Sequence, residues 1–204
     1  MEGRGTHDAA AQVPARPGAI ILARHGEPAL SRRCKLTSAE YRAWWDRYEE
    51  GGLLPGQVPP DHLKSTANGC AAVLASVRPR ALETARALLG ERAFDTDALF
   101  IEAPLPPPRF PDWIRLSPRN WGGVARFWWW FFDHHEGQER RHEAEARARA
   151  AADILIDRAK GGDVLLLAHG FFNAMIGQEL KKRGWRVTLN EGFKYWSARR
   201  FEKR

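Results

Sequence analysis

The chain has 204 residues, of which 44% are hydrophobic and 28% are charged, and its formal net charge is +7. This profile is typical of a globular protein, and the length fits one domain with a full core. The positive charge favours anionic partners, which include phosphorylated small molecules, nucleic acid and acidic membranes.

Features of the whole chain argue against secretion and membrane insertion. Cys34 and Cys70 have neither a metal-site spacing nor a disulfide framework, so we expect a reduced, cytoplasmic protein. Residues 1–18 lack the apolar centre of a secretory signal, and we expect a disordered leader there, followed by a single domain at 19–204. The aromatic run at 127–132 is far shorter than the ~20 residues of a membrane span, so no stable membrane insertion is expected.

Apolar runs alternate with amphipathic segments through the first half of the chain. The predicted strands lie at 19–23, 70–75 and 98–101, and the predicted helices at 39–50 and 80–89. Thr37 or Ser38 caps the first of these helices, and the glycines at 51–52 end it. Within the first helix, Tyr41, Trp44, Trp45 and Tyr48 recur at helical spacing and form an aromatic face. We expect Trp44 and Trp45 to pack this helix onto the sheet.

The composition changes at residues 103–140, where prolines and tryptophans are concentrated. Because proline breaks regular elements, we expect an insertion or lid here without helices or strands. The predicted elements that follow are a helix at 139–159, a strand at 164–168, a helix at 173–183 and a terminal strand or hairpin arm at 193–201. Alternating strands and helices predict a layered α/β sheet.

Two of the predicted strands end on a histidine followed by a glycine. The first is followed by Arg24, His25 and Gly26, and the strand at 164–168 is followed by His169 and Gly170. Buried strands of α/β proteins carry their chemistry at their carboxyl ends. We therefore expect the two imidazoles to converge on one anionic centre.

Four segments of the chain carry a family resemblance. They are Arg24-His25-Gly26-Glu27, Ser76 to Ala85, Glu102 after the third predicted strand, and Ala168-His169-Gly170. In this order they resemble the histidine phosphatase superfamily, in its phosphoglycerate mutase-like group. One such motif alone is weak evidence, whereas four in order across residues 19–180 are strong evidence. The resemblance implies a three-layer α/β/α sandwich with a mostly parallel central sheet.

The resemblance also implies roles for five residues: His25 as the nucleophile, Glu102 as the acid, and Arg24, Arg80 and His169 as phosphate ligands. Phosphoryl transfer places charge on three equatorial oxygens, and guanidinium forks neutralise that charge without a metal or other cofactor. Neighbouring arginines are expected to lower the pKa of His25, which keeps the imidazole neutral and nucleophilic. Glu102 would protonate the leaving oxygen and then accept a proton from the hydrolytic water.

Three positions depart from the family pattern. Ser31 stands where many members carry asparagine, and it can still donate a hydrogen bond to phosphate. The proline of the second motif is displaced to Pro79, so Arg78 competes with Arg80 for the phosphate role. Glu27 follows the first glycine and is a rival acid to Glu102.

Two other groups of residues have alternative interpretations. Asp133-His134-His135-Glu136 invites a metal site, but adjacent residues of a helix point about 100° apart, so we expect no metal there. The tryptophans of the insertion (Trp113, Trp121 and 128–130) either pack the lid, line an apolar substrate pocket, or contact a second copy or a membrane. Packing is the favoured interpretation.

The sequence thus predicts a metal-independent phosphatase that hydrolyses a small phosphomonoester through a phosphohistidine on His25. A phosphoglycerate-type mutase and a non-catalytic phospho-ligand binding module are the alternatives. A mutase needs basic groups for a second anion, so the aromatic insertion favours hydrolysis of a less polar substrate. No nucleic-acid-binding module of known type is present, so nucleic acid is not an expected partner. A homodimer is left open.

Overall fold

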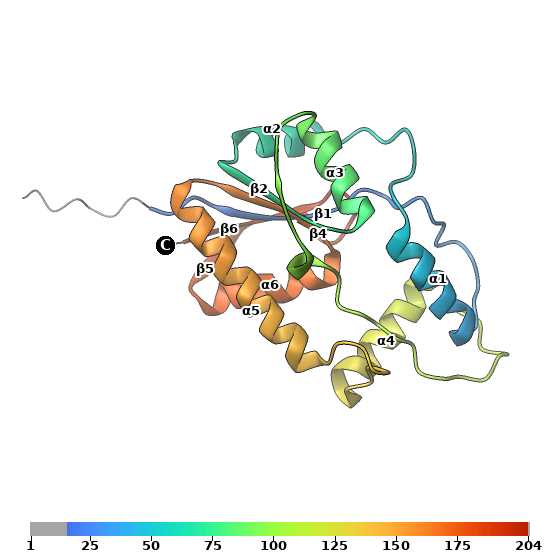
Figure 1. Ribbon diagram of the computed structural model, residues 1–204. Coiled ribbons are helices and arrows are strands. Elements are labelled where there is room, and N and C mark those ends of the chain that lie inside the picture. The colour runs from blue at the N-terminus through green and yellow to red at the C-terminus, as the bar shows by residue number, and fades with distance from the viewer. Residues whose placement is uncertain (1–15, 204) are drawn as a thin grey trace, which may run out of the picture.

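A computed structural model describes residues 16–203, so most of the predicted leader at 1–18 lies outside the described residues. Figure 1 shows a central sheet with helices on both sides. The strands are β1 (Ile20–Arg24), β2 (Ala72–Ser76), β3 (Asp95–Asp97), β4 (Val164–Ala168), β5 (Trp185–Asn190) and β6 (Ala198–Lys203). The helices are α1 (Ser38–Glu50), α2 (Asp61–Gly69), α3 (Pro79–Leu89), α4 (Pro118–Phe132), α5 (Arg141–Arg158) and α6 (Gly170–Lys182), with short 3₁₀ turns η1 (Ala98–Phe100) and η2 (Ala159–Gly161).

The sheet has the strand order β3-β2-β4-β1-β6-β5. Strands β1 to β4 pair in parallel, whereas β6 runs antiparallel to both β1 and β5. Helices α2 and α3 pack on one face of the sheet, and α5 and α6 pack on the other. The predicted three-layer α/β/α sandwich with a mostly parallel sheet is confirmed.

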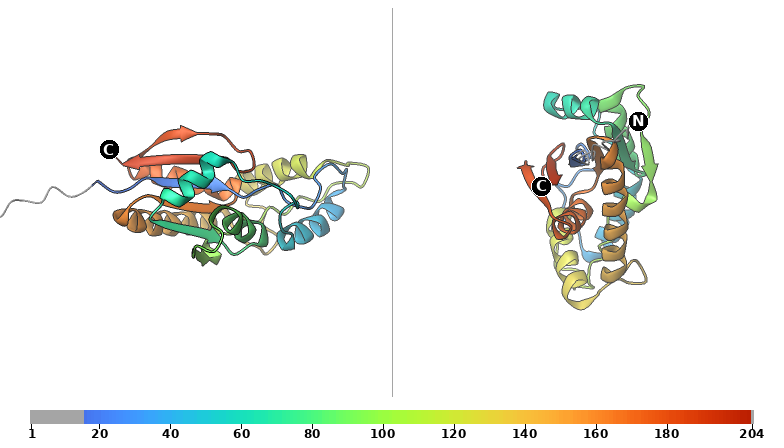
Figure 2. Two further views of the ribbon diagram at one scale, coloured as in Figure 1. Left: turned by 90° about the horizontal axis from the view of Figure 1, so that it is seen from above. Right: turned by 90° about the vertical axis from the view of Figure 1, so that its left-hand side faces the viewer.

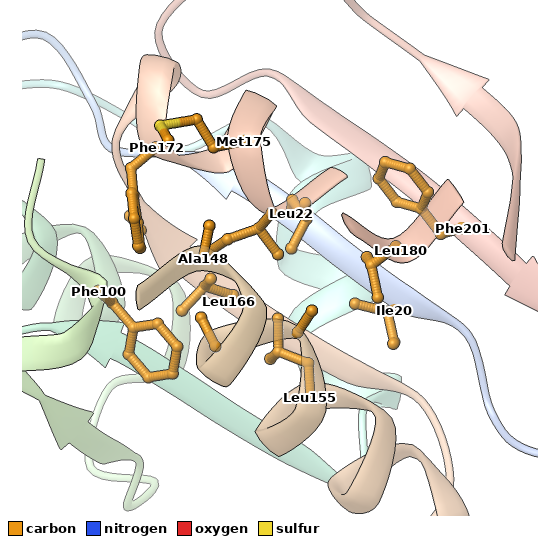
Figure 3. Close-up of a cluster of buried hydrophobic side chains, with 14 of the residues drawn as sticks. Ile20, Leu22, Phe100, Ala148, Leu155, Leu166, Phe172, Met175, Leu180 and Phe201 are labelled. Atoms are coloured by element: carbon orange, nitrogen blue, oxygen red, sulfur yellow. The ribbon is translucent and has the colours of Figure 1, made fainter. Parts of the chain in front are cut away.

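Strand β1 is buried on both faces, which explains its uninterrupted apolar sequence. Ile20 and Leu22 point toward α5 and α6, where they meet Leu155 and Leu180 (Figure 3). Ile21 points to the opposite face, toward α2 and α3. A strand held in this way between two layers places the residues at its carboxyl end on a rigid support.

The predicted strand at 98–101 is wrong. The neighbour of β2 is the short strand β3, and Ala98–Phe100 form the 3₁₀ turn η1. Asp97 caps this turn by accepting a hydrogen bond from the Leu99 amide at 2.8 Å, and Phe100 is fully buried. A short apolar run does not distinguish a strand from a buried turn of helix, which is why the pattern misled.

The prediction that residues 103–140 contain no regular element is also wrong, because α4 lies within them. Pro118 does not break this helix but begins it, at a position where the missing N–H is not needed. Ser117 caps the helix by accepting from the Asn120 amide. The aromatic run 127–132 forms its last two turns.

Several boundaries also differ from those predicted. Helix α6 begins at Gly170, directly after His169, rather than at Asn173. Helix α2 and strand β5 had no predicted counterpart, and the terminal segment forms a β5–β6 hairpin. Within residues 16–203, none of the helices is long and apolar enough to cross a bilayer.

Helices α1 and α4 lie beyond the carboxyl ends of β1 and β4 (Figures 1 and 2). They pack together through an aromatic cluster in which Tyr41, Trp44 and Tyr48 of α1 meet Trp121 of α4. Trp44 therefore packs α1 against α4. The prediction that it packs α1 onto the sheet is wrong. This pair of helices forms a wall opposite the strand ends.

Candidate active site

The register of two neighbouring strands brings the predicted histidines together. Arg24 of β1 pairs with Ala168 of β4, so the chains leave the sheet side by side at His25 and His169. The His25 amide donates to the Ala168 carbonyl at 3.0 Å. The two imidazole rings are 5.2 Å apart between centroids, and both side chains are buried.

Arg80, in the first turn of α3, connects the two histidines. Its Nε donates to His25 Nε2 and its Nη2 contacts His169 Nδ1, both at 3.3 Å. The side chain has no exposed surface, and Nη1 donates to the Tyr48 carbonyl at 2.9 Å. Of the two arginines that competed in the sequence, Arg80 is the one that reaches both imidazoles.

Both histidines are neutral in this arrangement. Burial, followed by the positive charges of Arg80 and Arg24, holds the pKa of His25 well below its usual range. Burial and the charge of Arg80 do the same to the pKa of His169. His25 Nδ1 donates to the Gly26 carbonyl at 2.7 Å, so in the neutral tautomer Nε2 carries the lone pair, which accepts the Arg80 Nε–H. A nucleophile needs that lone pair.

Glu49, near the end of α1, is a residue that the sequence analysis missed. Its carboxylate binds Arg80 Nη2 at 2.6 Å and Arg78 Nε at 2.7 Å. It therefore supplies the counter-charge for the buried guanidinium and also pairs with Arg78. An acid on an amphipathic helix has the sequence signature of a solvated residue, so no local signal marks it.

Two hydroxyl groups of the second motif hold the histidine and arginine segments in place. Ser76, at the end of β2, lies 2.9 Å from His169 Nε2. Thr84 donates to the Arg80 carbonyl at 2.6 Å and accepts from the Gly26 amide at 3.0 Å. The motif thus fixes the tautomer of His169 and the turn at Gly26 at the same time.

Arg24 lies at the mouth of this corner. Its guanidinium sits 4.3 Å from the centre of the Tyr195 ring and donates to the Phe193 carbonyl at 2.5 Å. Gly26 allows Trp196 to pack directly on the turn, because a Cβ there would lie 2.4 Å from the tryptophan ring. The β5–β6 connection therefore closes one side of the site.

The two candidate acids have different surroundings. Glu102 follows η1 rather than a strand, and its oxygens accept from the Phe172 amide at 2.8 Å and the Phe171 amide at 3.3 Å. These amides begin α6, so Glu102 is fixed beside His169. Glu27 is exposed, and only its backbone is tied down, by Gln57. Both carboxylates line the same cavity as the histidines.

This cavity has a volume of about 1380 Å³ and lies between the strand ends and the wall made by α1 and α4. The five residues predicted for the site all line it: Arg24, His25, Arg80, Glu102 and His169. Ser31 lines it too, whereas the Asp133–Glu136 segment does not. In that segment Glu136 is engaged by Arg42, through a hydrogen bond of 2.7 Å to Nη2.

The tryptophans at 113–130 do not line the cavity in the described part of the chain. Trp121 and Trp129 are fully buried, and their indole N–H groups donate to the carbonyls of Leu36 and Glu139. Trp113 is 81% exposed. From α4 the cavity instead receives Arg119, Gly122 and Arg126.

The lowered pKa values of the two histidines predict a loss of stability in acid. Below about pH 6.5 these imidazoles bind protons in the unfolded chain but not in the folded protein. Each histidine should therefore lower the free energy of unfolding by about 1.4 kcal/mol when the pH falls from about 7.5 to about 5.5. Replacing both His25 and His169 by Asn should flatten this dependence in urea titrations at the two pH values. His142→Asn, at an exposed position, is the control. An unchanged pH dependence in the double variant would contradict neutral, buried histidines.

Removing the counter-charge of Arg80 should destabilise the fold. Glu49→Gln leaves a buried guanidinium without its carboxylate, and we expect a loss of about 3 kcal/mol in the free energy of unfolding by chemical denaturation. Glu50→Gln removes the same charge from the neighbouring, exposed position and should change it by less than about 0.5 kcal/mol. Equal effects of the two substitutions would show that Glu49 does not support Arg80.

Comparisons with solved structures show the same fold. The chain resembles the product of open reading frame Rv3214 from Mycobacterium tuberculosis, with 19% identity, a TM-score of 0.54, and coverage of 91% of this chain and 96% of that chain. A mutant phosphoserine phosphatase from Entamoeba histolytica gives 14% identity, a TM-score of 0.54 and coverage of 81% and 80%. Bacillus stearothermophilus YhfR gives 22% identity, a TM-score of 0.51 and coverage of 81% and 80%.

None of the curated protein sequences matches this chain significantly. The sequence profile of the histidine phosphatase superfamily (branch 1), in contrast, matches residues 61–191, which is more than half of the chain. This match includes the segment from Ser76 to Ala85 and the second histidine, His169. His25 precedes the matched residues, but the pairing of β1 with β4 places it beside His169. The chain belongs to the histidine phosphatase superfamily, branch 1.

Proposed function

We propose that this protein hydrolyses a small phosphomonoester through a phosphohistidine on His25, without a metal ion. The observation that carries the proposal is the buried corner in which Arg80 contacts both His25 and His169. A tetrahedral phosphoryl group needs donors on several sides and a nucleophile in line with the leaving oxygen. Arg24 and Arg80 are the donors in this proposal, and His169 becomes a third donor when its Nδ1 is protonated.

In the first step the lone pair of His25 Nε2 attacks phosphorus and the bond to the leaving oxygen breaks. The Gly26 carbonyl holds Nδ1–H and stabilises the positive charge that develops on the imidazole. The N–H groups of Arg80 that point toward the imidazoles are assigned to the phosphoryl oxygens. Glu102 in its protonated form gives its proton to the leaving oxygen.

In the second step water attacks the phosphohistidine, and its proton passes to the Glu102 carboxylate. The P–N bond breaks, His25 recovers its lone pair, and inorganic phosphate leaves. Arginine side chains neutralise the charge throughout, which is why the mechanism requires no metal. Because both cysteines are free thiols in the structure, we also place the protein in a reducing, cytoplasmic setting.

A phosphoglycerate-type mutase is the second candidate function. The position of α4 supports it. The sequence argument against a mutase assumed that the insertion presents aromatic groups to the substrate, but α4 presents Arg119 and Arg126. Release of inorganic phosphate, measured against return of the phosphoryl group to a phosphoglycerate acceptor, separates the two reactions.

Replacing the nucleophile tests the phosphohistidine. His25→Ala should lower turnover of phenyl phosphate by at least about 1000-fold. Rapid quench in alkaline detergent with ³²P-labelled ester should trap a phosphoryl group on the wild-type protein that survives base and is lost in acid, and none on the variant. His62→Ala, at an exposed histidine, is the control. Wild-type turnover should persist with a chelator present, and its strict dependence on metal would refute the mechanism.

A protein that binds phosphate but shows no wild-type turnover of any ester would be the non-catalytic binding module instead.

The choice between the two acids is tested by the leaving group. Glu102→Gln should lower kcat by about 100-fold or more for an alkyl phosphate, whose leaving oxygen needs a proton, and much less for 4-nitrophenyl phosphate. Glu27→Gln should leave this difference between the two substrates as in the wild type. The opposite pattern, with the leaving-group dependence lost in Glu27→Gln, would assign the acid to Glu27.

A further inference from the structure

The cavity carries more positive charge than one phosphoryl group neutralises. Seven arginine and lysine side chains line it against the two carboxylates of Glu27 and Glu102. Arg80 is already paired with Glu49, but the remaining excess still exceeds the two negative charges of a phosphate monoester. Arg33, Arg119 and Lys194 are exposed to solvent, whereas Arg24, Arg32 and Arg126 are half-buried and carry charge that an anionic ligand would compensate.

Four polar groups of this cavity are buried without a hydrogen-bond partner among residues 16–203: Arg24 Nε, Arg32 Nε, Arg126 Nε and the Tyr41 hydroxyl. Tyr41 has no exposed surface, and burial raises the pKa of its phenol, so the hydroxyl keeps its proton. A buried donor without a partner costs stability, and natural proteins contain few of them. Their presence in one cavity indicates a ligand group that accepts hydrogen bonds.

Two of these donors meet where α1 faces α4. A Cβ at Gly122 would lie 3.6 Å from the buried Tyr41 hydroxyl, and both residues line the cavity. Arg126, one turn further along α4, holds its guanidinium 4.9 Å from the centre of the Phe171 ring. Stacking of this kind fixes the plane of the guanidinium and leaves its N–H groups free to bind an oxyanion.

The same ring connects the α4 side of the cavity to the phosphoryl corner. Phe171 is the second residue of α6, and its amide donates to Glu102. Arg126, Glu102 and His169 therefore all lie around the N-terminal end of α6. A ligand that fills the cavity from His25 would reach Arg126 on this side.

Resting on the proposed function, we propose that the substrate carries a second anionic group, which Arg126 and Tyr41 bind between α1 and α4. A carboxylate or a second phosphoryl group supplies the oxygen acceptors that these donors need. The unpartnered Tyr41 hydroxyl and Arg126 Nε lie on the α1 and α4 side of this positively charged cavity. The less polar substrate expected from the aromatic composition of the insertion is replaced by a substrate with two anionic groups.

Three aryl esters test this proposal: phenyl phosphate, 4-carboxyphenyl phosphate and 1,4-phenylene bisphosphate. The wild-type kcat/KM should be about tenfold or more higher for at least one of the two esters with a second anion than for phenyl phosphate. The preferred ester identifies the second anion as carboxylate or phosphoryl. Equal kcat/KM values for all three would overturn the proposal while leaving the phosphatase mechanism intact.

Variants of the two ligands should remove this selectivity. Arg126→Gln should lower the ratio of the two kcat/KM values toward one, and Arg126→Lys should restore part of it. Tyr41→Phe should lower the ratio without lowering the melting temperature, because the hydroxyl it removes has no partner within the described chain. Arg109→Gln removes a charge from an exposed position of the same segment outside the cavity and should leave the ratio unchanged.

The two proposals fail in different ways. If none of the three esters is turned over, the phosphatase mechanism is wrong, and calorimetric affinities of the same esters still compare one anion with two. An unaltered ratio in Arg126→Gln would remove this residue from the site, whatever the activity.

Discussion

The buried guanidinium of Arg80 is the constraint on which the site depends. A charge with no exposed surface loses its hydration, and the protein must replace that hydration with fixed partners. Glu49 provides the counter-charge, the Tyr48 carbonyl accepts one N–H, and the two imidazoles accept the others. These partners come from α1, β1 and β4, so the position of Arg80 requires that three distant parts of the chain are already packed. The reward of this arrangement is a set of donors that need no reorganisation when an oxyanion binds.

The sheet and the helices contribute to the cavity in different ways. Strands β1 and β4 are buried on both faces, and their pairing holds His25 and His169 at a fixed separation. Helix α4 is held to the rest of the molecule by buried tryptophans, since Trp121 donates to the Leu36 carbonyl and Trp129 to that of Glu139. The aromatic residues of the 103–140 segment therefore anchor its helix, and the arginines of the same helix line the cavity. This division lets one amphipathic element serve both packing and recognition.

The aromatic face of α1 has a similar double use. Trp44 and Tyr48 pack in the cluster with Trp121, whereas the Tyr48 carbonyl and the neighbouring Glu49 turn toward Arg80. Any shift of α1 would move the counter-charge of Arg80 and the hydroxyl of Tyr41 together. The position of Arg80 and one side of the cavity thereby depend on the same helix.

The sequence by itself predicted the fold class and five residues that line the cavity. His25 and His169 follow strands and Arg80 begins a helix, in patterns visible within about ten residues, whereas Glu102 follows the turn η1. Local patterns failed where tertiary packing decides the outcome: residues 98–101 form a turn around buried Phe100, and Pro118 begins a helix because buried Trp121 and Trp129 fasten it. Only the tertiary structure shows that Glu49 binds Arg80 and that Tyr41 and Arg126 line the cavity. On their amphipathic helices these residues look like ordinary solvated or core positions, and it is the contact between α1, α3 and α4 that buries their polar atoms together.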